Sequence, residues 1–247
     1  MTKLSGIGKL SLTQKICLAG LFAATATILQ KVLAINYLAN LPFFRISFGA
    51  PAIIVFSSIF LGPIWGAAVG AFSDLIGYFA FDMSGYGFFP LVTLIYLVLG
   101  LLSFFVFKLI DKIGNEKRIF IIEIVSLLCL FVGLSLYIIL GYECSLTFKI
   151  LIPVGLFLLL ALLTGFQIWS STRKGKLYTP IKISFTYFLL DFFVLVLFGT
   201  LMKAISFNAM NIYKEILITQ SLVMIFNVAF NSILLATFFR LTKKYME

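Results

Sequence analysis

Long apolar runs, separated by short charged or turn-rich breaks, occupy almost the whole chain. Most of these runs reach the roughly 20 residues that a helix needs to cross the hydrocarbon core of a bilayer. They cover residues 14–36, 47–62, 63–82, 88–110, 119–141, 147–170, 183–204 and 216–240. The pattern predicts an all-α integral membrane protein, a helical bundle of about eight transmembrane helices that forms a single transmembrane domain over residues 1–247.

Two of these runs allow a second interpretation. The run 47–62 is short and ends at Gly62-Pro63, where proline closes one helix and opens the next. We therefore expect 47–82 to be a tight helical hairpin, the alternative being one kinked helix with a re-entrant piece. The first run follows three lysines, as in a signal peptide, but an uncleaved helix is simpler because the runs after it are also apolar.

The positive charges indicate how the bundle is oriented. The chain has 19 Lys and Arg against 9 Asp and Glu. With a cytoplasmic N-terminus and eight spans, 14 of the 19 basic residues fall on the cytoplasmic side. Those left outside or near the outer ends are Arg45, Lys149, Lys203 and Lys214, with Lys31 late in the first helix. The positive-inside rule thus predicts that both termini are cytoplasmic, and a bacterial plasma membrane is the expected location.

Composition narrows the chemistry. At 62% apolar residues and a mean hydropathy of +1.14, the chain is too apolar for a soluble globule. With no histidine and three cysteines, a metal site or a disulfide framework is disfavoured, so we expect no cofactor. No GxxxxGK[ST] loop, GxSxG elbow or HExxH motif occurs, so the chain is not expected to be an enzyme. An intramembrane protease using Asp74 and Asp191 is the enzyme alternative.

Charged groups inside the apolar runs need a reason, because each is costly in lipid. Asp74 lies midway along 63–82 among small residues and is a candidate acceptor for donors on a substrate. Its alternative role is a buried carboxylate satisfied by neighbouring helices. Arg45 at the outer end of the second run is a candidate partner for a substrate carboxylate, or an interfacial snorkelling arginine. Asp191 and Glu123 are expected to be structural or interfacial, with ligand binding as the alternative.

An aromatic segment over residues 81–93 joins two helices on the predicted outer side. Its glycines allow a loop to fold over a flat ring, and its aromatic residues can stack on one. Tyr86, Phe89 and Thr93 are the candidate ligand contacts in this segment. The alternative is an ordinary aromatic belt at the membrane interface.

Two helical stripes are also candidates for contacts. On the last run, polar and sulfur-containing residues share one face: Gln220, Met224, Asn227 and Asn231. Gln220, at the outer end, is the candidate ligand contact, whereas the asparagines are expected to bond other helices. On the first run, Ala19 and Ala23 form a small-xxx-small pair, echoed one step along by Gly20 and Ala24, which would allow a helix to approach closely.

Taken in order, these features resemble the substrate-binding (S) component of an energy-coupling factor (ECF) vitamin transporter. The resemblance rests on the AxxxA pair, on the RISFG segment 45–49 and on the run FLGPIWGAAVGAFSDLIG over 60–77. The pattern FGPxxGxxxGxxxDxxG is most similar to the folate-specific branch. Residues 14–110 correspond to the first four helices of the family core and 183–240 to its closing pair, while 119–170 is an additional hairpin.

The resemblance implies a subunit that binds a vitamin at its extracellular end, and folate or a related pterin is the expected substrate. It implies a transmembrane coupling subunit, contacted through Ala19 and Ala23, and two cytoplasmic ATPases as partners. It also implies that Asp74 and the aromatic residues hold the ring and that Arg45 holds an acidic tail. An S component for another vitamin or small precursor, and a stand-alone membrane scaffold or facilitator, are the alternative functions.

Overall fold

The computed structural model describes residues 10–32, 35–36, 45–46, 49–81, 88–141, 146–171 and 180–246. Nearly all of these residues are helical. The helices are α1 (Leu12–Thr27), α2 (Ala50–Leu61), α3 (Pro63–Phe81), α4 (Pro90–Asp111), α5 (Glu116–Leu136), α6 (Leu146–Ser171), α7 (Pro180–Leu190), α8 (Gly199–Ser206) and α9 (Tyr213–Met246). Among the described residues, seven helices are long and apolar enough to cross a membrane. The chain is therefore a multi-pass, all-helical membrane protein.

Three long helices include π-helical turns. These turns are η2 (Ile28–Val32) after α1, η3 (Tyr137–Gly141) after α5, and η4 (Asp191–Phe198) between α7 and α8. A short 3-10 turn, η5 (Met210–Ile212), precedes α9. π-helical turns are rare and often occur at functional sites. Two of them begin or end beside a charged residue of a membrane span, Lys31 in η2 and Asp191 in η4.

The predicted hairpin 47–82 forms as two helices separated by one residue. Gly62 has φ 107°, a backbone conformation that only glycine adopts easily, and Pro63 begins α3. The first helix, α2, has 12 residues and is about 18 Å long, too short to cross a 30 Å hydrocarbon core. Eleven of its residues are buried, so α2 is a central, protein-surrounded helix rather than an ordinary span.

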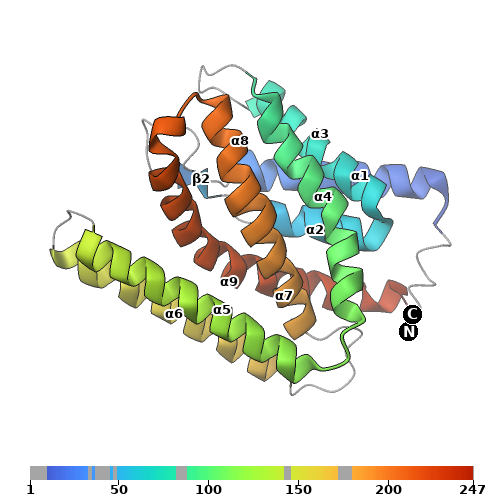
Figure 1. Cartoon of the computed structure of the whole chain (residues 1–247). Helices are drawn as coiled ribbons and strands as arrows, with labels where there is room; N and C mark the ends of the chain where they lie inside the picture. Colours follow the sequence, from blue (N-terminus) through green and yellow to red (C-terminus); the bar gives the residue numbers. More distant parts are fainter. Residues whose placement is uncertain are drawn as a thin grey trace.

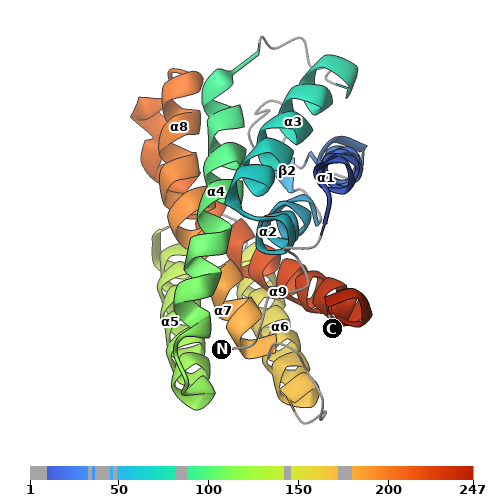
Figure 2. The same ribbon diagram turned by 90° about the vertical axis from the view of Figure 1, so that its right-hand side faces the viewer.

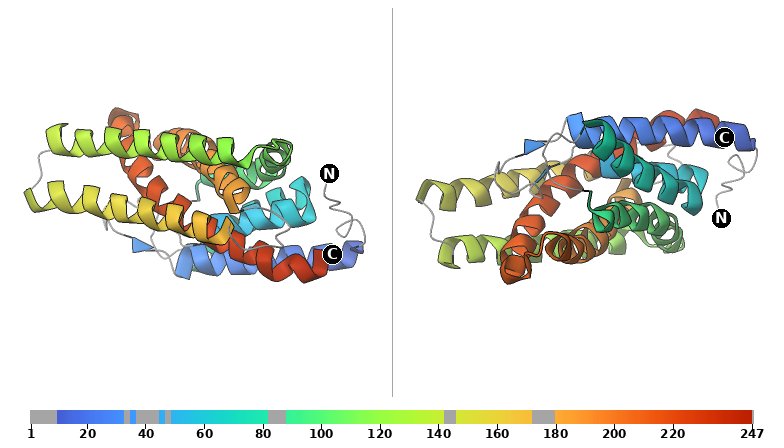
Figure 3. Two further views of the ribbon diagram at one scale, coloured as in Figure 1. Left: turned by 90° about the horizontal axis from the view of Figure 1, so that it is seen from below. Right: turned by 90° about the horizontal axis from the view of Figure 1, so that it is seen from above.

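The remaining expected runs match the observed helices to within a few residues. α7, η4 and α8 form one continuous helix. With these three taken together, successive helices run in alternating directions across the bundle (Figure 1). α1 and α2 cross α4 steeply instead of running beside it (Figure 2). The start of α1 and the end of α9 lie at the same end of the molecule (Figure 3).

α5 and α6 form a long antiparallel hairpin at one side of the bundle, seen as the green and yellow pair in Figure 3. This pair packs on α7 and α9, the closing helices. A two-residue strand pair lies between α1 and α2: β1 (Ile35–Asn36) faces β2 (Arg45–Ile46) in antiparallel register. The strand pair brings the backbone of Arg45 opposite Asn36, directly after the end of η2.

Candidate functional site

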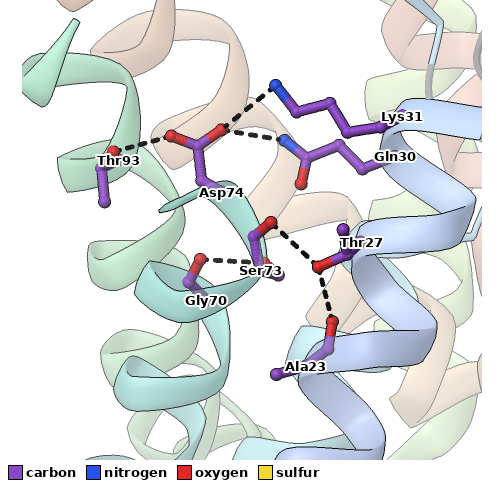
Figure 4. A network of polar contacts seen from close by, with 8 residues as sticks. All are labelled: Ala23, Thr27, Gln30, Lys31, Gly70, Ser73, Asp74 and Thr93. Carbon is purple, nitrogen blue, oxygen red and sulfur yellow. Dashed lines mark hydrogen bonds and ion pairs between the residues drawn. The ribbon is translucent and has the colours of Figure 1, made fainter. Parts of the chain in front are cut away.

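Asp74 is a buried carboxylate held by side chains from two other helical elements. It is 4% exposed, and its Oδ2 accepts a hydrogen bond of 2.6 Å from the Thr93 hydroxyl of α4. Its Oδ1 accepts a hydrogen bond of 3.3 Å from Gln30 Nε2 and lies 3.9 Å from Lys31 Nζ (Figure 4). We call Gln30, Lys31, Asp74 and Thr93 the Asp74 cluster. It compensates the carboxylate with one cation and two hydrogen-bond donors.

The π-turn η2 explains how two adjacent residues reach the same carboxylate. A π-turn holds more residues per turn than an α-turn, so the side chains of Gln30 and Lys31 are separated by a smaller angle. Both side chains are nearly buried. Gly77 makes room for the lysine, because a Cβ at this position would lie 2.6 Å from Lys31 Cε. The last glycine of the sequence pattern thus accommodates the counter-ion of Asp74.

One turn below Asp74, hydroxyl groups connect α1 to α3. The Thr27 hydroxyl lies 2.8 Å from the Ala23 carbonyl and 3.0 Å from the Ser73 carbonyl, and can donate to either (Figure 4). The Ser73 hydroxyl donates to the Gly70 carbonyl at 2.9 Å. These contacts fix the helix that carries Lys31 against the helix that carries Asp74.

The other glycines of α3 let backbones touch. A Cβ at Gly70 would collide with the carbonyl of Tyr96 in α4, and a Cβ at Gly66 would collide with Ser58 in α2. A Cβ at Gly100 of α4 would in turn collide with the carbonyl of Gly66. Small residues permit such close helix crossings in membranes. The spacing GxxxGxxxD therefore packs α3 against α2 and α4 and sets Asp74 one turn beyond the contact.

The structure brings together only part of the predicted site. Asp74 and Thr93 are directly bonded. Phe89 lies at the start of α4, where its ring packs against Phe207 at a centroid distance of 4.4 Å. Gln220 is buried on α9, and within the described ranges no hydrogen bond joins it to Asp74. Tyr86 and the side chain of Arg45 lie outside the described residues.

The two alanines proposed as a contact for a coupling subunit point into the bundle. Ala19 is 9% exposed and Ala23 is 4% exposed, and both belong to the hydrophobic core. Their small size lets α1 pack against α2 and α3 of the same chain. In this structure their methyl groups are therefore not on a surface that a partner can touch. The exposed small residues of α1 are instead Gly20 and Ala24.

A second buried carboxylate lies where the hairpin meets the closing helices. Glu123 of α5 is fully buried, and its Oε1 accepts hydrogen bonds from Gln167 Nε2 of α6 at 3.0 Å and from the Ser184 hydroxyl of α7. Ser184 Oγ also lies 3.2 Å from Ser232 Oγ of α9. We call Glu123, Gln167, Ser184 and Ser232 the Glu123 cluster. Its four members come from four different helices.

A third buried carboxylate, Asp191, begins η4 and is 1% exposed. Asp191 interacts electrostatically with the ammonium group of Lys203 and with the side chain of Tyr187. Neither oxygen of Asp191 has a hydrogen-bond partner among the described residues, and the same holds for the Tyr187 hydroxyl and the Asn231 amide. The predicted polar stripe on α9 does face inward, since Gln220, Met224 and Asn231 are all buried.

Sequence reasoning missed Gln30 and Lys31 as partners of Asp74. The available signal was Lys31 itself, a basic residue within an apolar run, which should have been matched with an acidic residue elsewhere. Among the residues searched, no group of three or more potential metal-ligating side chains occurs. No family model, curated protein or solved structure matches this chain.

Proposed function

We propose that this chain is the substrate-binding subunit of an ATP-driven importer of the ECF type, with folate or a related pterin as its substrate. The observation that carries the proposal is the Asp74 cluster, a buried group of polar side chains set near one end of the bundle. The strand pair containing Arg45, the end of α3 and the start of α4 lie at this same end. A polar ligand entering there would meet both a carboxylate and an arginine.

The charge distribution supports an outward-facing position for this end. The opposite end of the bundle carries most basic residues of the described helices: Lys108, Lys112, Lys117, Arg118, Lys182 and Arg240. Positively charged ends of membrane helices favour the cytoplasm. In this proposal both termini are cytoplasmic, and the Asp74 cluster takes up solute from outside.

Asp74 suits a flat heterocycle because its hydrogen bonds can be exchanged. The Gln30 contact is long at 3.3 Å, and Gln30 Oε1 is buried without a partner. Ring NH groups could replace Gln30 at Asp74 Oδ1, which would free the Gln30 amide to bond the ligand. Arg45 would pair with an acidic tail through its planar guanidinium group.

Direct binding to the purified protein tests the substrate. Folate, a pterin without the acidic tail, and unrelated vitamins would be titrated by calorimetry. Arg45→Ala should weaken folate binding about 10-fold or more and leave the tail-less pterin unchanged. Lys214→Ala removes an exposed cation elsewhere and is the matched control. Equal loss for both ligands would remove the tail assignment, and binding of a different vitamin alone would replace the substrate.

Docking of the coupling subunit is tested separately. In this proposal the exposed face of α1 that carries Gly20 and Ala24 touches the partner, since no atom lies within 4 Å of a Cβ built at Gly20. Gly20→Trp should abolish co-purification with a coupling module while ligand binding persists. Leu162→Trp, on an exposed position of α6, is the control. Unchanged co-purification of Gly20→Trp would exclude this face.

A further inference from the structure

The two oxygens of Glu123 have different surroundings. Oε1 accepts two hydrogen bonds, from Gln167 Nε2 and from the Ser184 hydroxyl. Oε2 is buried and has no partner among the described residues. An ionised carboxylate carries equal charge on both oxygens, and leaving one of them buried without a donor is costly. The one-sided arrangement is what a neutral acid requires, because its carbonyl oxygen accepts while its hydroxyl oxygen donates.

The acceptor for such a hydroxyl is present in the same cluster. Gln167 uses both hydrogens of Nε2, on Glu123 Oε1 and on Ser184 Oγ at 2.8 Å. Its own Oε1 is buried and unpartnered. A carboxylic acid and a primary amide have complementary edges, one donor and one acceptor on each. A single proton on Glu123 Oε2 would therefore give a partner to both unpartnered oxygens.

Among the residues that the structure describes, no cation pairs with Glu123, whereas Asp74 and Asp191 each interact with a lysine. Lys31 lies beside Asp74, and Lys203 acts on Asp191. The side chains that donate hydrogen bonds to Glu123 are those of Ser184 and Gln167, and both are uncharged.

Lysines, arginines and tyrosines on the surrounding helices either interact with other residues or are exposed. Lys182 of α7 is paired with Asp111, and Tyr187 of the same helix faces Asp191, Tyr96 and Asn231. The remaining basic residues near this end of α5 and α9 are exposed: Lys117, Arg118 and Arg240. Within the part of the chain that the structure describes, only a proton or another small cation from solution can neutralise Glu123.

We propose that Glu123 is a proton-binding site that locks the α5–α6 hairpin onto the closing helices. In the resting chain one proton from the aqueous phase is bound at Oε2, and the Oε2 hydroxyl donates to Gln167 Oε1. The neutral acid then joins α5 to α6, α7 and α9 without placing a net charge in the membrane. Loss of the proton leaves an uncompensated carboxylate among four helices and loosens the hairpin. The proposal does not depend on which substrate the protein binds.

Infrared spectroscopy of the wild-type protein tests the protonation state directly, because a protonated carboxyl group and a carboxylate absorb at different frequencies. The wild-type spectrum at neutral pH minus the Glu123→Gln spectrum should show the band of a protonated carboxyl group shielded from solvent, and any band from the buried Asp191 cancels in this difference. The wild-type spectrum minus that of Glu215→Gln, a change at an exposed position of α9, should not show it. Absence of the band from the difference between the wild type and Glu123→Gln would overturn the proposal.

Thermal unfolding in detergent supplies the second test. If the folded chain holds one proton more than the unfolded chain, stability falls as pH rises. Between about pH 6 and about pH 9 the wild type should lose at least about 3 °C of its unfolding midpoint relative to Glu123→Gln. Glutamine imitates the neutral acid, so the two proteins should unfold at the same temperature at low pH.

Unfolding measured with and without sodium distinguishes a bound proton from a bound sodium ion. Replacing choline chloride by sodium chloride at constant pH should shift the wild-type midpoint no more than that of Glu123→Gln. A sodium-dependent stabilisation that only the wild type shows would overturn the proton assignment in favour of a sodium site. Equal pH profiles for the wild type and Glu123→Gln would contradict the proposal as a whole.

Discussion

The α1–α4 half of the bundle and the α5–α6 hairpin solve the same problem in different ways. Each buries a carboxylate in the membrane. In α1–α4, Asp74 has a lysine 3.9 Å away, and glycines bring backbones into direct contact around it. In the hairpin, the partners of Glu123 within the described ranges are uncharged, and no described atom lies within 4 Å of a Cβ built at Gly133, Gly155 or Gly165.

This difference shows that a glycine or an acidic residue in an apolar run has no fixed meaning. The α3 glycines are closely packed positions that no side chain can occupy without displacing a neighbouring helix. The hairpin glycines face open space, where lipid would lie. Likewise, Asp74 is compensated by a charge, whereas Glu123 is compensated by hydrogen bonds alone. The four predictions below test this comparison.

The largest effect should come from placing a side chain where the backbones of α3 and α4 touch, at Gly100. Gly100→Val places a branched side chain against the Gly66 carbonyl, so α3 and α4 must separate. We expect a loss of more than about 4 kcal/mol, and hence little folded protein. Yield and monodispersity in size-exclusion chromatography measure this. A well-folded Gly100→Val protein would show that the backbone contact is not required.

Removing the cation from the Asp74 cluster should be nearly as severe. Lys31→Met leaves a buried, uncompensated carboxylate, which should cost about 3–5 kcal/mol. The double variant with Asp74→Asn removes the charge and should recover much of that stability. Chemical denaturation of both single variants and the double variant gives the coupling energy. Additive effects would mean that the two residues do not interact.

Removing one hydroxyl from each cluster compares a charged acceptor with a neutral one. Thr93→Val removes the donor to Asp74, and a hydrogen bond to a charged group is worth about 1.5–3 kcal/mol. Ser184→Ala removes a donor to Glu123, which should cost about 0.5–1.5 kcal/mol if that acid is neutral. Unfolding midpoints rank the two. A larger loss in Ser184→Ala would argue against a neutral Glu123.

The smallest effect belongs to the hairpin surface. Gly165 is exposed on α6 with free space around it, so Gly165→Ala meets no obstacle. Alanine restricts the unfolded chain and favours the helix, so we expect a gain of about 0.4–1 kcal/mol. The same measurement of the unfolding midpoint applies. Destabilisation by Gly165→Ala would reveal a contact that this face makes with another molecule.

Several residues of the candidate site could be predicted from the sequence, but their hydrogen-bond and ion-pair partners could not. Asp74 and Thr93 were singled out from sequence, and the structure joins them at 2.6 Å. Lys31 was assigned only to the outer part of the first helix, because a π-turn cannot be inferred from hydrophobic periodicity. The partners of Glu123 could not be predicted, because the two side chains that donate hydrogen bonds to it lie 44 and 61 positions later in the chain.

The hydrophobic pattern was enough to locate the apolar helices, because the length and apolarity of a run decide whether lipid can surround it. The break at Gly62-Pro63 is also visible in the sequence. Glycine adopts a φ of 107° easily, and proline has no backbone N–H to continue the hydrogen bonds of the preceding helix. Which face of each helix is covered follows from the packing of the helices on one another. Packing turned Ala19 and Ala23 inward and placed Lys31 beside Asp74, and the described side chains that it brought to Glu123 are uncharged, because helix packing depends on surfaces distant in the chain.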